Sequence, residues 1–193
     1  MCDPQVNSER VRPGEPSPWV TRFLGALVRT DGEVVDVACG KGRHLQLGLA
    51  AGFRMVGVDR DVSSARLVAA DSRLVLIEAD LESGAAWPLG DRRFDGVIVT
   101  NYLWRPMLPA IVGAVGPAGA LIYETFGAGQ ERLGRPRNRE FLLQPGELID
   151  VARPTLTIIA YENVVLSDPD RIVQRVAAVG RQHPLAQAMA SPA

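Results

Sequence analysis

The residues best suited to chemistry gather around a glycine-rich turn in the first quarter of the chain. A buried strand is predicted over 34–38, and it leads through Cys39-Gly40-Lys41-Gly42 into a helix over 43–51. Glycine lets the backbone turn tightly and approach a ligand closely, and the amides that open the helix can donate to that ligand. The turn therefore predicts a ligand site, while a purely structural turn explains a glycine pair equally well.

Two carboxylates make the predicted ligand site more specific, and the first of them argues against a dinucleotide. Asp36 lies on the strand itself, where its charge would oppose a diphosphate and attract a cationic amine. The third glycine of the dinucleotide fingerprint is replaced by Leu45. Asp59 ends the next predicted strand, where a carboxylate can accept hydrogen bonds from both hydroxyls of a ribose. Together they favour a ribose-containing ligand with a cationic group.

The elements that must position these residues alternate between strand and helix. Helices are predicted over 17–28, 43–51, 62–70 and 106–115, and strands over 34–38, 54–58, 74–79, 94–100 and 118–125. Parallel neighbours need crossover connections, so this rhythm predicts an α/β fold with a mainly parallel sheet and helices on both faces.

The rhythm changes after the fifth strand. A long loop over 126–143 leads to a short helix at 145–151, and strands over 155–165 and 171–179 predict an antiparallel hairpin. We expect one domain over 1–180, opened by a loose arm at 1–16, and a disordered tail over 181–193. The hairpin makes the expected sheet seven-stranded.

These segments, in this order, resemble the class I S-adenosylmethionine-dependent methyltransferases, which have a Rossmann-like, doubly wound fold. The resemblance covers Gly32 to Thr125 and includes Glu78-Ala79-Asp80-Leu81, Phe94 to Tyr102 and Pro117 to Glu124. One departure is Ala38, where many relatives have a glycine. A narrower likeness, to bacterial methyltransferases related to tellurite-resistance protein B, comes from Gly40 to His44, Thr100-Asn101-Tyr102 and the Gly-Arg-Pro-Arg-Asn loop, and it points to a small substrate.

The resemblance implies S-adenosyl-L-methionine as cofactor and S-adenosyl-L-homocysteine as product. It places Asp36 near the methionine moiety, Asp59 at the ribose, and Asp80 with Leu81 at the adenine. The full expected cofactor set is Asp36, Ala38, Cys39, Gly40, Gly42, His44, Asp59, Arg60, Asp80, Leu81 and Asn101. No metal is expected, because methyl transfer from a sulfonium requires positioning and, where needed, proton removal.

Three residues are candidate bases, and each has an ordinary structural alternative. Tyr102 follows a central strand, at the edge where open α/β sheets bind ligands, but a phenol with a pKa near 10 is a poor base. Glu124 ends the neighbouring strand and is otherwise a solvated strand end or cap partner. His44 opens the helix after the glycine turn, and a lone histidine more often packs or caps.

Arginines crowd the predicted loop over 126–143. Arg132, Arg135, Arg137 and Arg139 would clamp an anionic acceptor if the loop closed as a lid, although solvated loop charge is the simpler interpretation. Trp19, in the first predicted helix, is read as core packing, with a lid over the cofactor as the alternative.

Composition limits the other classes. A net charge of −1 gives no global positive field, so neither nucleic acid nor a membrane surface is an expected partner. Two cysteines make a disulfide framework or metal cluster implausible, and the start of the chain lacks a basic stretch followed by an apolar run, which fits a cytoplasmic protein.

The sequence thus predicts a methyltransferase acting on a small acceptor. Two other classes stay open. One is a non-catalytic module that binds the cofactor and meets a partner, and the other, disfavoured by Asp36, is a nicotinamide-dependent oxidoreductase.

Overall fold

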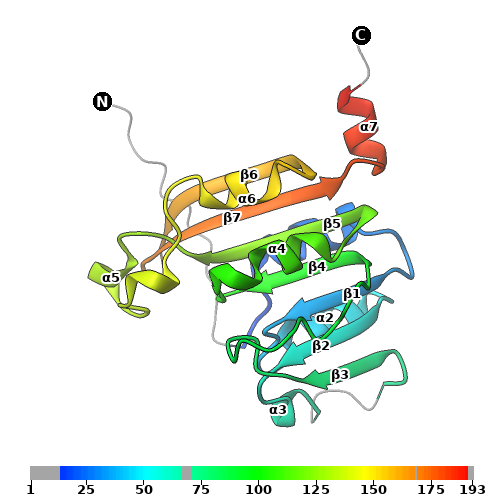
Figure 1. The fold of residues 1–193 in the computed structure, drawn as a ribbon, viewed down its shortest axis with the longest axis horizontal. Coiled ribbons are helices and arrows are strands. Elements are labelled where there is room, and N and C mark those ends of the chain that lie inside the picture. The colour runs from blue at the N-terminus through cyan, green and yellow to red at the C-terminus, as the bar shows by residue number, and fades with distance from the viewer. Residues whose placement is uncertain (1–13, 67–70, 168, 191–193) are drawn as a thin grey trace.

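Seven strands form one sheet in the order β3-β2-β1-β4-β5-β7-β6 (Figure 1). The computed structural model describes residues 14–66, 71–167 and 169–190. Six strands run parallel, and β7 runs antiparallel to both of its neighbours. The strands are β1 Glu33–Val37, β2 Arg54–Asp59, β3 Leu74–Glu78, β4 Phe94–Thr100, β5 Val115–Phe126, β6 Leu156–Leu166 and β7 Arg171–Gly180. The predicted mainly parallel sheet with a C-terminal antiparallel hairpin is confirmed.

Helices cover both faces of this sheet, as predicted. In Figure 1, α1 and α2 lie behind the sheet, while α4 and α6 lie in front of it. The α-helices are α1 Pro18–Leu27, α2 Arg43–Ala50, α3 Ser63–Arg66, α4 Leu108–Gly113, α5 Gln130–Leu133, α6 Glu147–Ala152 and α7 Pro184–Ala190, and short 3-10 turns span Arg105–Met107 and Arg139–Phe141.

The core forms two layers because successive strand residues point to opposite faces. Val34, Ile98 and Ile122 pack on the face covered by α1 and α2. Their neighbours Val35 and Val97 belong to the other cluster, with α4 and α6. Central strands buried on both faces read as near-continuous apolar runs, which is what makes them recognisable in the sequence.

Strand β5 begins earlier than predicted. The sequence predicts a strand only from residue 118, but 115–117 also lie inside β5, where Gly116 and Gly119 pack directly on the start of β4. A Cβ on Gly119 would stand 2.4 Å from the carbonyl oxygen of Phe94. The pairing between β4 and β5 shifts register between Phe94 and Gly96, which accommodates the extra residues.

The predicted disordered tail over 181–193 is wrong for its described part, which contains α7. His183 ties this helix to the body: its Nε2 lies 3.0 Å from the carbonyl oxygen of Leu27, and its Nδ1 accepts from the amide of Leu185 at 3.2 Å. Ala186 is buried against the core. The sequence of α7, rich in Ala, Gln and Met, does not show the apolar pattern of a buried helix. The helix is recognised only through these tertiary contacts.

Other expectations fall partly outside the described residues. Of the predicted helix over 62–70, α3 accounts for four residues, and 67–70 are not described. Of the expected loose arm, only 14–16 are described. The loop over 126–143 contains α5 and a 3-10 turn, and a bridge between Gly127 and Leu143 closes its ends.

Candidate functional site

The glycine turn after β1 has the backbone geometry that the sequence predicts. Gly40 and Gly42 have φ values of +53° and +80°, in the left-handed region that favours glycine. Ala38 also lies there, at +56°, which costs a residue with a Cβ about 1 kcal/mol. The turn is fixed by hydrogen bonds from the amide of Cys39 to the carbonyl oxygen of Val58, and from that of Gly42 to Cys39.

Asp59 connects this turn to a cavity. One carboxylate oxygen accepts from the amide of Gly40 at 2.8 Å and the other from the amide of Asp61 at 3.1 Å. Each carboxylate oxygen has a second lone-pair site, so Asp59 can still accept from a ligand. The adjoining cavity, of about 240 Å³, is lined by Ala38, Asp59, Arg60, Ala79, Asp80, Leu81, Glu82 and Tyr102. Five residues of the expected cofactor set therefore share one cavity.

Asp36 is a buried carboxylate without a hydrogen-bond donor among the described residues. Its side chain is 1% exposed, and both carboxylate oxygens lack a partner there. The pKa of Asp36 is raised to about 8, chiefly by burial and also by the charge of Asp59, although the charge of Arg43 opposes the shift. A buried acceptor of this kind favours a positively charged or hydrogen-bond-donating group nearby. That property fits the amine and sulfonium of S-adenosylmethionine.

His44 is held as a neutral ring. Its Nε2 accepts from the amide of Ser17 at 3.0 Å, so the proton lies on Nδ1, 3.5 Å from the hydroxyl of Thr100 and 3.8 Å from the carboxylate of Asp36. Burial, aided by the charge of Arg43, lowers the pKa of His44 to about 3. The Ser17 amide occupies the lone pair that a base would use, so the geometry favours a structural role.

Glu124 is neither solvated nor free. It is buried at the end of β5, accepts from the hydroxyl of Ser17 at 3.0 Å, and pairs with Nη1 of Arg175 at 3.3 Å. Arg175 also pairs with Glu162, and its guanidinium lies 4.6 Å from the ring centre of Trp19. Trp19 is 1% exposed, which supports core packing and not a lid. Glu124 is thus the centre of a buried polar network that sequence reasoning did not predict.

Tyr102 is the candidate base whose polar group is buried but has no partner among the described residues. It contributes to a second cavity of about 210 Å³ as well as to the first, and its hydroxyl has no hydrogen-bond partner among the described residues. Burial raises the pKa of this phenol well above its ordinary value, and Glu82, Asp80 and Asp59 raise it further. Tyr102 is therefore an unsuitable base but a suitable hydrogen-bond donor.

The second cavity adjoins the first at Glu82 and Tyr102. Its lining is Glu82, Asn101, Tyr102, Leu103, Thr125, Phe126, Pro136 and Phe141. Asn101, from the expected cofactor set, lies here with φ of +55°, and its backbone amide donates to the carbonyl oxygen of Glu124. Pro136 and Phe141 were not predicted as site residues. In the sequence, these two residues stand out only as apolar positions within a loop that is rich in charged residues.

The loop arginines do not line either cavity. Arg132 and Arg139 border a separate hollow of about 300 Å³ beside Gly129, and Arg139 pairs with Glu131 at 3.2 Å. Arg135 and Arg137 are exposed. The loop reaches the site through apolar side chains, which does not support the expected anion clamp.

Cys39 is buried beside the turn, and burial raises the pKa of its thiol, so it stays protonated at neutral pH. Within the described residues, no group of three or more His, Cys, Asp or Glu side chains could hold a metal ion. The same part of the chain contains no helix long and apolar enough to cross a membrane.

Comparison with known proteins places this fold among methyltransferases. An S-adenosylmethionine-dependent methyltransferase from Mesorhizobium loti is 16% identical over 83% of this chain and 97% of its own, with a TM-score of 0.65. A TehB-like methyltransferase from Corynebacterium glutamicum is 18% identical over 84% and 87%, with a TM-score of 0.59.

A third solved structure, 1,6-didemethyltoxoflavin-N1-methyltransferase from Burkholderia thailandensis with bound S-adenosylhomocysteine, is 18% identical over 84% and 76%, with a TM-score of 0.63. No protein-family model and no curated protein sequence matches the chain. At these identities the likeness concerns the fold, which is the class I methyltransferase fold.

Proposed function

We propose that this protein transfers a methyl group from S-adenosylmethionine to a small acceptor. The observation that carries the proposal is the position of Asp59. It braces the glycine turn through Gly40 while bordering the cavity that also contains Asp80 and Leu81. In an open α/β sheet this carboxyl edge is where ligands bind.

Each cofactor-facing residue then has a task that follows from its chemistry. Asp59 accepts from the ribose hydroxyls, Asp80 accepts from the exocyclic amine of adenine, and Leu81 packs on the ring. Asp36 supplies a negative charge next to the cationic end, where an ionic partner would stabilise its charged form. The cofactor supplies an electrophilic methyl group on a sulfonium. The protein's part is to orient it and exclude water.

The acceptor we propose is uncharged or cationic, with an apolar or aromatic body. The second cavity joins aromatic and aliphatic side chains to one carboxylate, that of Glu82, and it contains no basic residue. A cationic amine is stabilised by a carboxylate and by aromatic faces. Tyr102 lies between the two cavities, where its free hydroxyl can donate to the acceptor and hold it in line with the methyl group.

A non-catalytic cofactor-binding module is the second candidate, because the geometry disfavours all three candidate bases, Tyr102, Glu124 and His44, as proton acceptors. Many methyl transfers need only positioning, so this observation does not favour it over catalysis. A nicotinamide enzyme is disfavoured because a diphosphate would oppose ionisation of the buried Asp36, whereas a cationic ligand would stabilise its charged form.

Isothermal calorimetry with S-adenosylmethionine, S-adenosylhomocysteine and NADH tests the cofactor. We expect the first two to bind, and Asp59→Ala to weaken them at least tenfold. Asp91→Ala is the matched control, because Asp91 is exposed in the turn before β4 and lines neither cavity. Binding of NADH alone would overturn the proposal.

Radiolabelled methyl transfer to a panel of small amines, phenols and carboxylates tests catalysis. Cofactor binding without turnover on any of them, in protein that is folded, would favour the non-catalytic module. Turnover restricted to carboxylates or oxyanions would contradict the proposed acceptor class while preserving the cofactor.

A further inference from the structure

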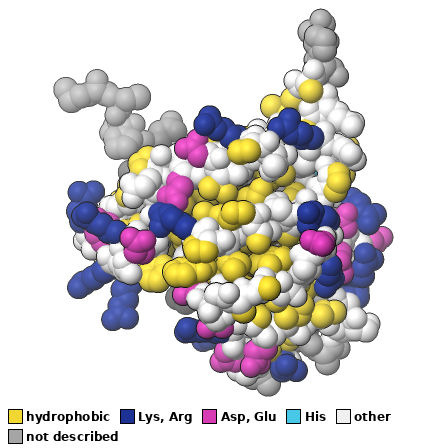
Figure 2. Space-filling model, in the orientation of Figure 1, with side chains coloured by type: hydrophobic (Ala, Val, Ile, Leu, Met, Phe, Trp, Pro, Cys, Tyr) yellow, Lys and Arg dark blue, Asp and Glu magenta, His cyan; other side chains and the backbone are white. Residues whose placement is uncertain are grey.

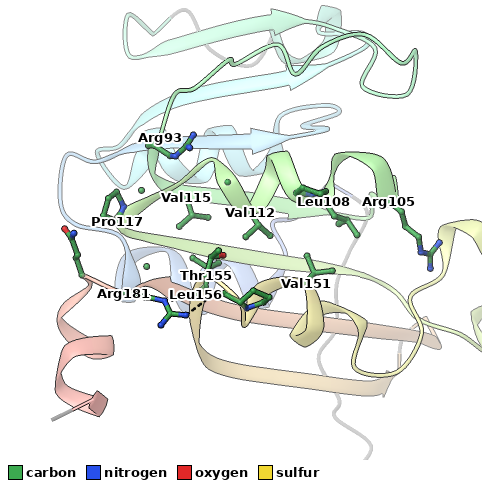
Figure 3. Close-up of a pocket in the computed structure, with 16 residues that line it drawn as sticks. Arg93, Arg105, Leu108, Val112, Val115, Pro117, Val151, Thr155, Leu156 and Arg181 are labelled. Carbon is green, nitrogen blue, oxygen red and sulfur yellow. Dashed lines mark hydrogen bonds between the residues drawn. The ribbon is translucent and has the colours of Figure 1, made fainter.

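A larger hollow shares no lining residue with the two cavities described above. It is a groove of about 760 Å³ between α4 and α6, and we call it the α4–α6 groove. Leu108 and Val112 of α4, Val115 of β5, Val151 of α6 and Leu156 of β6 line it (Figure 3). Figure 2 shows hydrophobic side chains gathered over this part of the front face.

The groove exists because the covering helices are short. Helices α4 and α6 have six residues each, about 9 Å of helix, whereas β5 has 12 residues. They leave the end of the sheet where β5 begins and β7 ends uncovered. This is the amino edge of the parallel strands, opposite the edge of Asp59 and Tyr102, so the proposed methyl transfer does not use it.

Helix α7 carries an exposed apolar stripe, which is formed by Leu185 and Met189. Leu185 and Met189 are 42% and 65% exposed, and residues four apart share one face of a helix. The adjacent face is buried through Ala186. Because His183 fixes the start of the helix, the stripe is presented in a defined direction, and α7 projects beyond the sheet in Figure 1. Exposed apolar surface on a rigid element is typical of an interaction site.

The groove and the helix are neighbours in the fold. Gly180, Arg181 and Gln182 line one end of the groove and lead directly into α7. This end is bordered by Arg93 and Arg181, which are exposed and donate to main-chain carbonyls of their own copy. Helix α7 has no charged side chain, so a helix of this sequence can approach that rim without repulsion.

We propose that α7 of a second copy of this chain docks in the α4–α6 groove, and that the contact is reciprocal. A two-fold axis beside 180–182 would bring each helix to the other copy's groove, since a two-fold interface repeats the same contact twice. Leu185 and Met189 would fill the groove as the anchors of a helix-in-groove contact. The two apolar surfaces would then cover each other.

Sedimentation velocity of the full chain over a range of concentrations tests this. We expect a dimer, and we expect the double variant Leu185→Glu with Met189→Glu to raise the dimer dissociation constant at least 100-fold. Leu133→Glu is the matched control, because Leu133 is 47% exposed on α5, at the other end of the molecule, and should leave the dimer intact.

A complementation arm distinguishes this contact from another dimer. Val151→Glu places a charge in the groove from a half-buried position, and it too should yield monomers with an unchanged circular dichroism spectrum. Mixing it with the α7 double variant leaves one intact helix-groove pair, so heterodimers should form. A parent that stays monomeric, a dimer indifferent to the α7 substitutions, or variants that do not complement would each overturn the proposal.

Discussion

The backbone amide of Ser17 donates to Nε2 of His44 at 3.0 Å, although the two residues are 27 positions apart. Ser17 also caps α1, since its hydroxyl oxygen accepts from the amide of Trp19. Ser17 thus caps α1 and connects the start of this helix to α2, the helix that follows the glycine turn. The bond couples the order of the N-terminal helix to that of the proposed cofactor site.

We predict that His44→Phe lowers the free energy of unfolding by about 1–3 kcal/mol, because it leaves the buried Ser17 amide without an acceptor while keeping the ring volume. Urea denaturation followed by circular dichroism measures this. Gln46→Ala, exposed on the same helix, should stay within about 0.5 kcal/mol of the parent. Equal stability of the two variants would show that the bond contributes nothing.

Asp36 should make the ligand-free protein less stable as the pH rises. Its pKa is about 8 in the fold against an ordinary 3.8, so between these values the folded state keeps a proton that the unfolded chain releases. The free energy of unfolding then falls by up to about 1.4 kcal/mol per pH unit. His44, with a lowered pKa, acts oppositely, with stability lost as pH falls below its ordinary value of 6.5.

Between pH 6.5 and 8 the ring of His44 is neutral in the folded state and increasingly neutral in the unfolded chain, and it is present in both proteins, so Asp36 accounts for the difference between parent and Asp36→Asn. We expect the parent to lose stability across this window relative to the variant, in urea titrations at fixed ionic strength. Parallel pH profiles would contradict a raised pKa for Asp36.

Substitution of Glu124 should affect folding before it affects chemistry. Glu124→Ala removes one of the carboxylate partners of the buried Arg175, and breaking a buried ion pair costs about 3–5 kcal/mol. The exposed pair of Arg92 and Glu33, at 3.1 Å, is the comparison, and Glu33→Ala should cost under about 1 kcal/mol. A Glu124→Ala protein of parental stability that lacks turnover would instead identify Glu124 as a base.

Tyr102→Phe should separate binding from catalysis. The hydroxyl has no partner in the described protein, so its removal should leave the free energy of unfolding unchanged or raise it slightly. We expect kcat to fall about 10–100-fold, with cofactor affinity changed less than threefold, since the hydroxyl is assigned to the acceptor. Calorimetry and steady-state kinetics supply the two readouts. Loss of cofactor affinity alone would move Tyr102 to the cofactor site.

The strands and the carboxylates at their ends could be predicted from the sequence because their signals are local. Buried parallel strands are apolar runs of fixed length, and Asp59 and Asp80 follow such runs directly. Since carboxyl ends of parallel strands meet at one edge, predicting the strands also predicted that these side chains share a cavity.

The polar network could not be predicted, because each of its bonds joins distant parts of the chain. Glu124 meets Ser17 across 107 positions and Arg175 across 51, and no local pattern records such a meeting. The same holds for α7, whose order depends on the contact of His183 with Leu27. The arginines of the loop over 126–143 led to a different error. Their charge suggested an anion site, but they line neither cavity, whereas apolar residues of the same loop line the second one.

The strand order places β7 between β5 and β6, so the last strand of the sheet joins two strands that precede it. As the chain leaves the ribosome, β6 therefore emerges with no strand to pair with, and the edge of β5 stays open until the final part of the chain follows. Closure of the sheet depends on the C-terminal segment, and so does burial of Glu124, whose arginine partner arrives on that strand. Synthesis of β7 is thus the step that completes both the sheet and the buried polar network around Glu124.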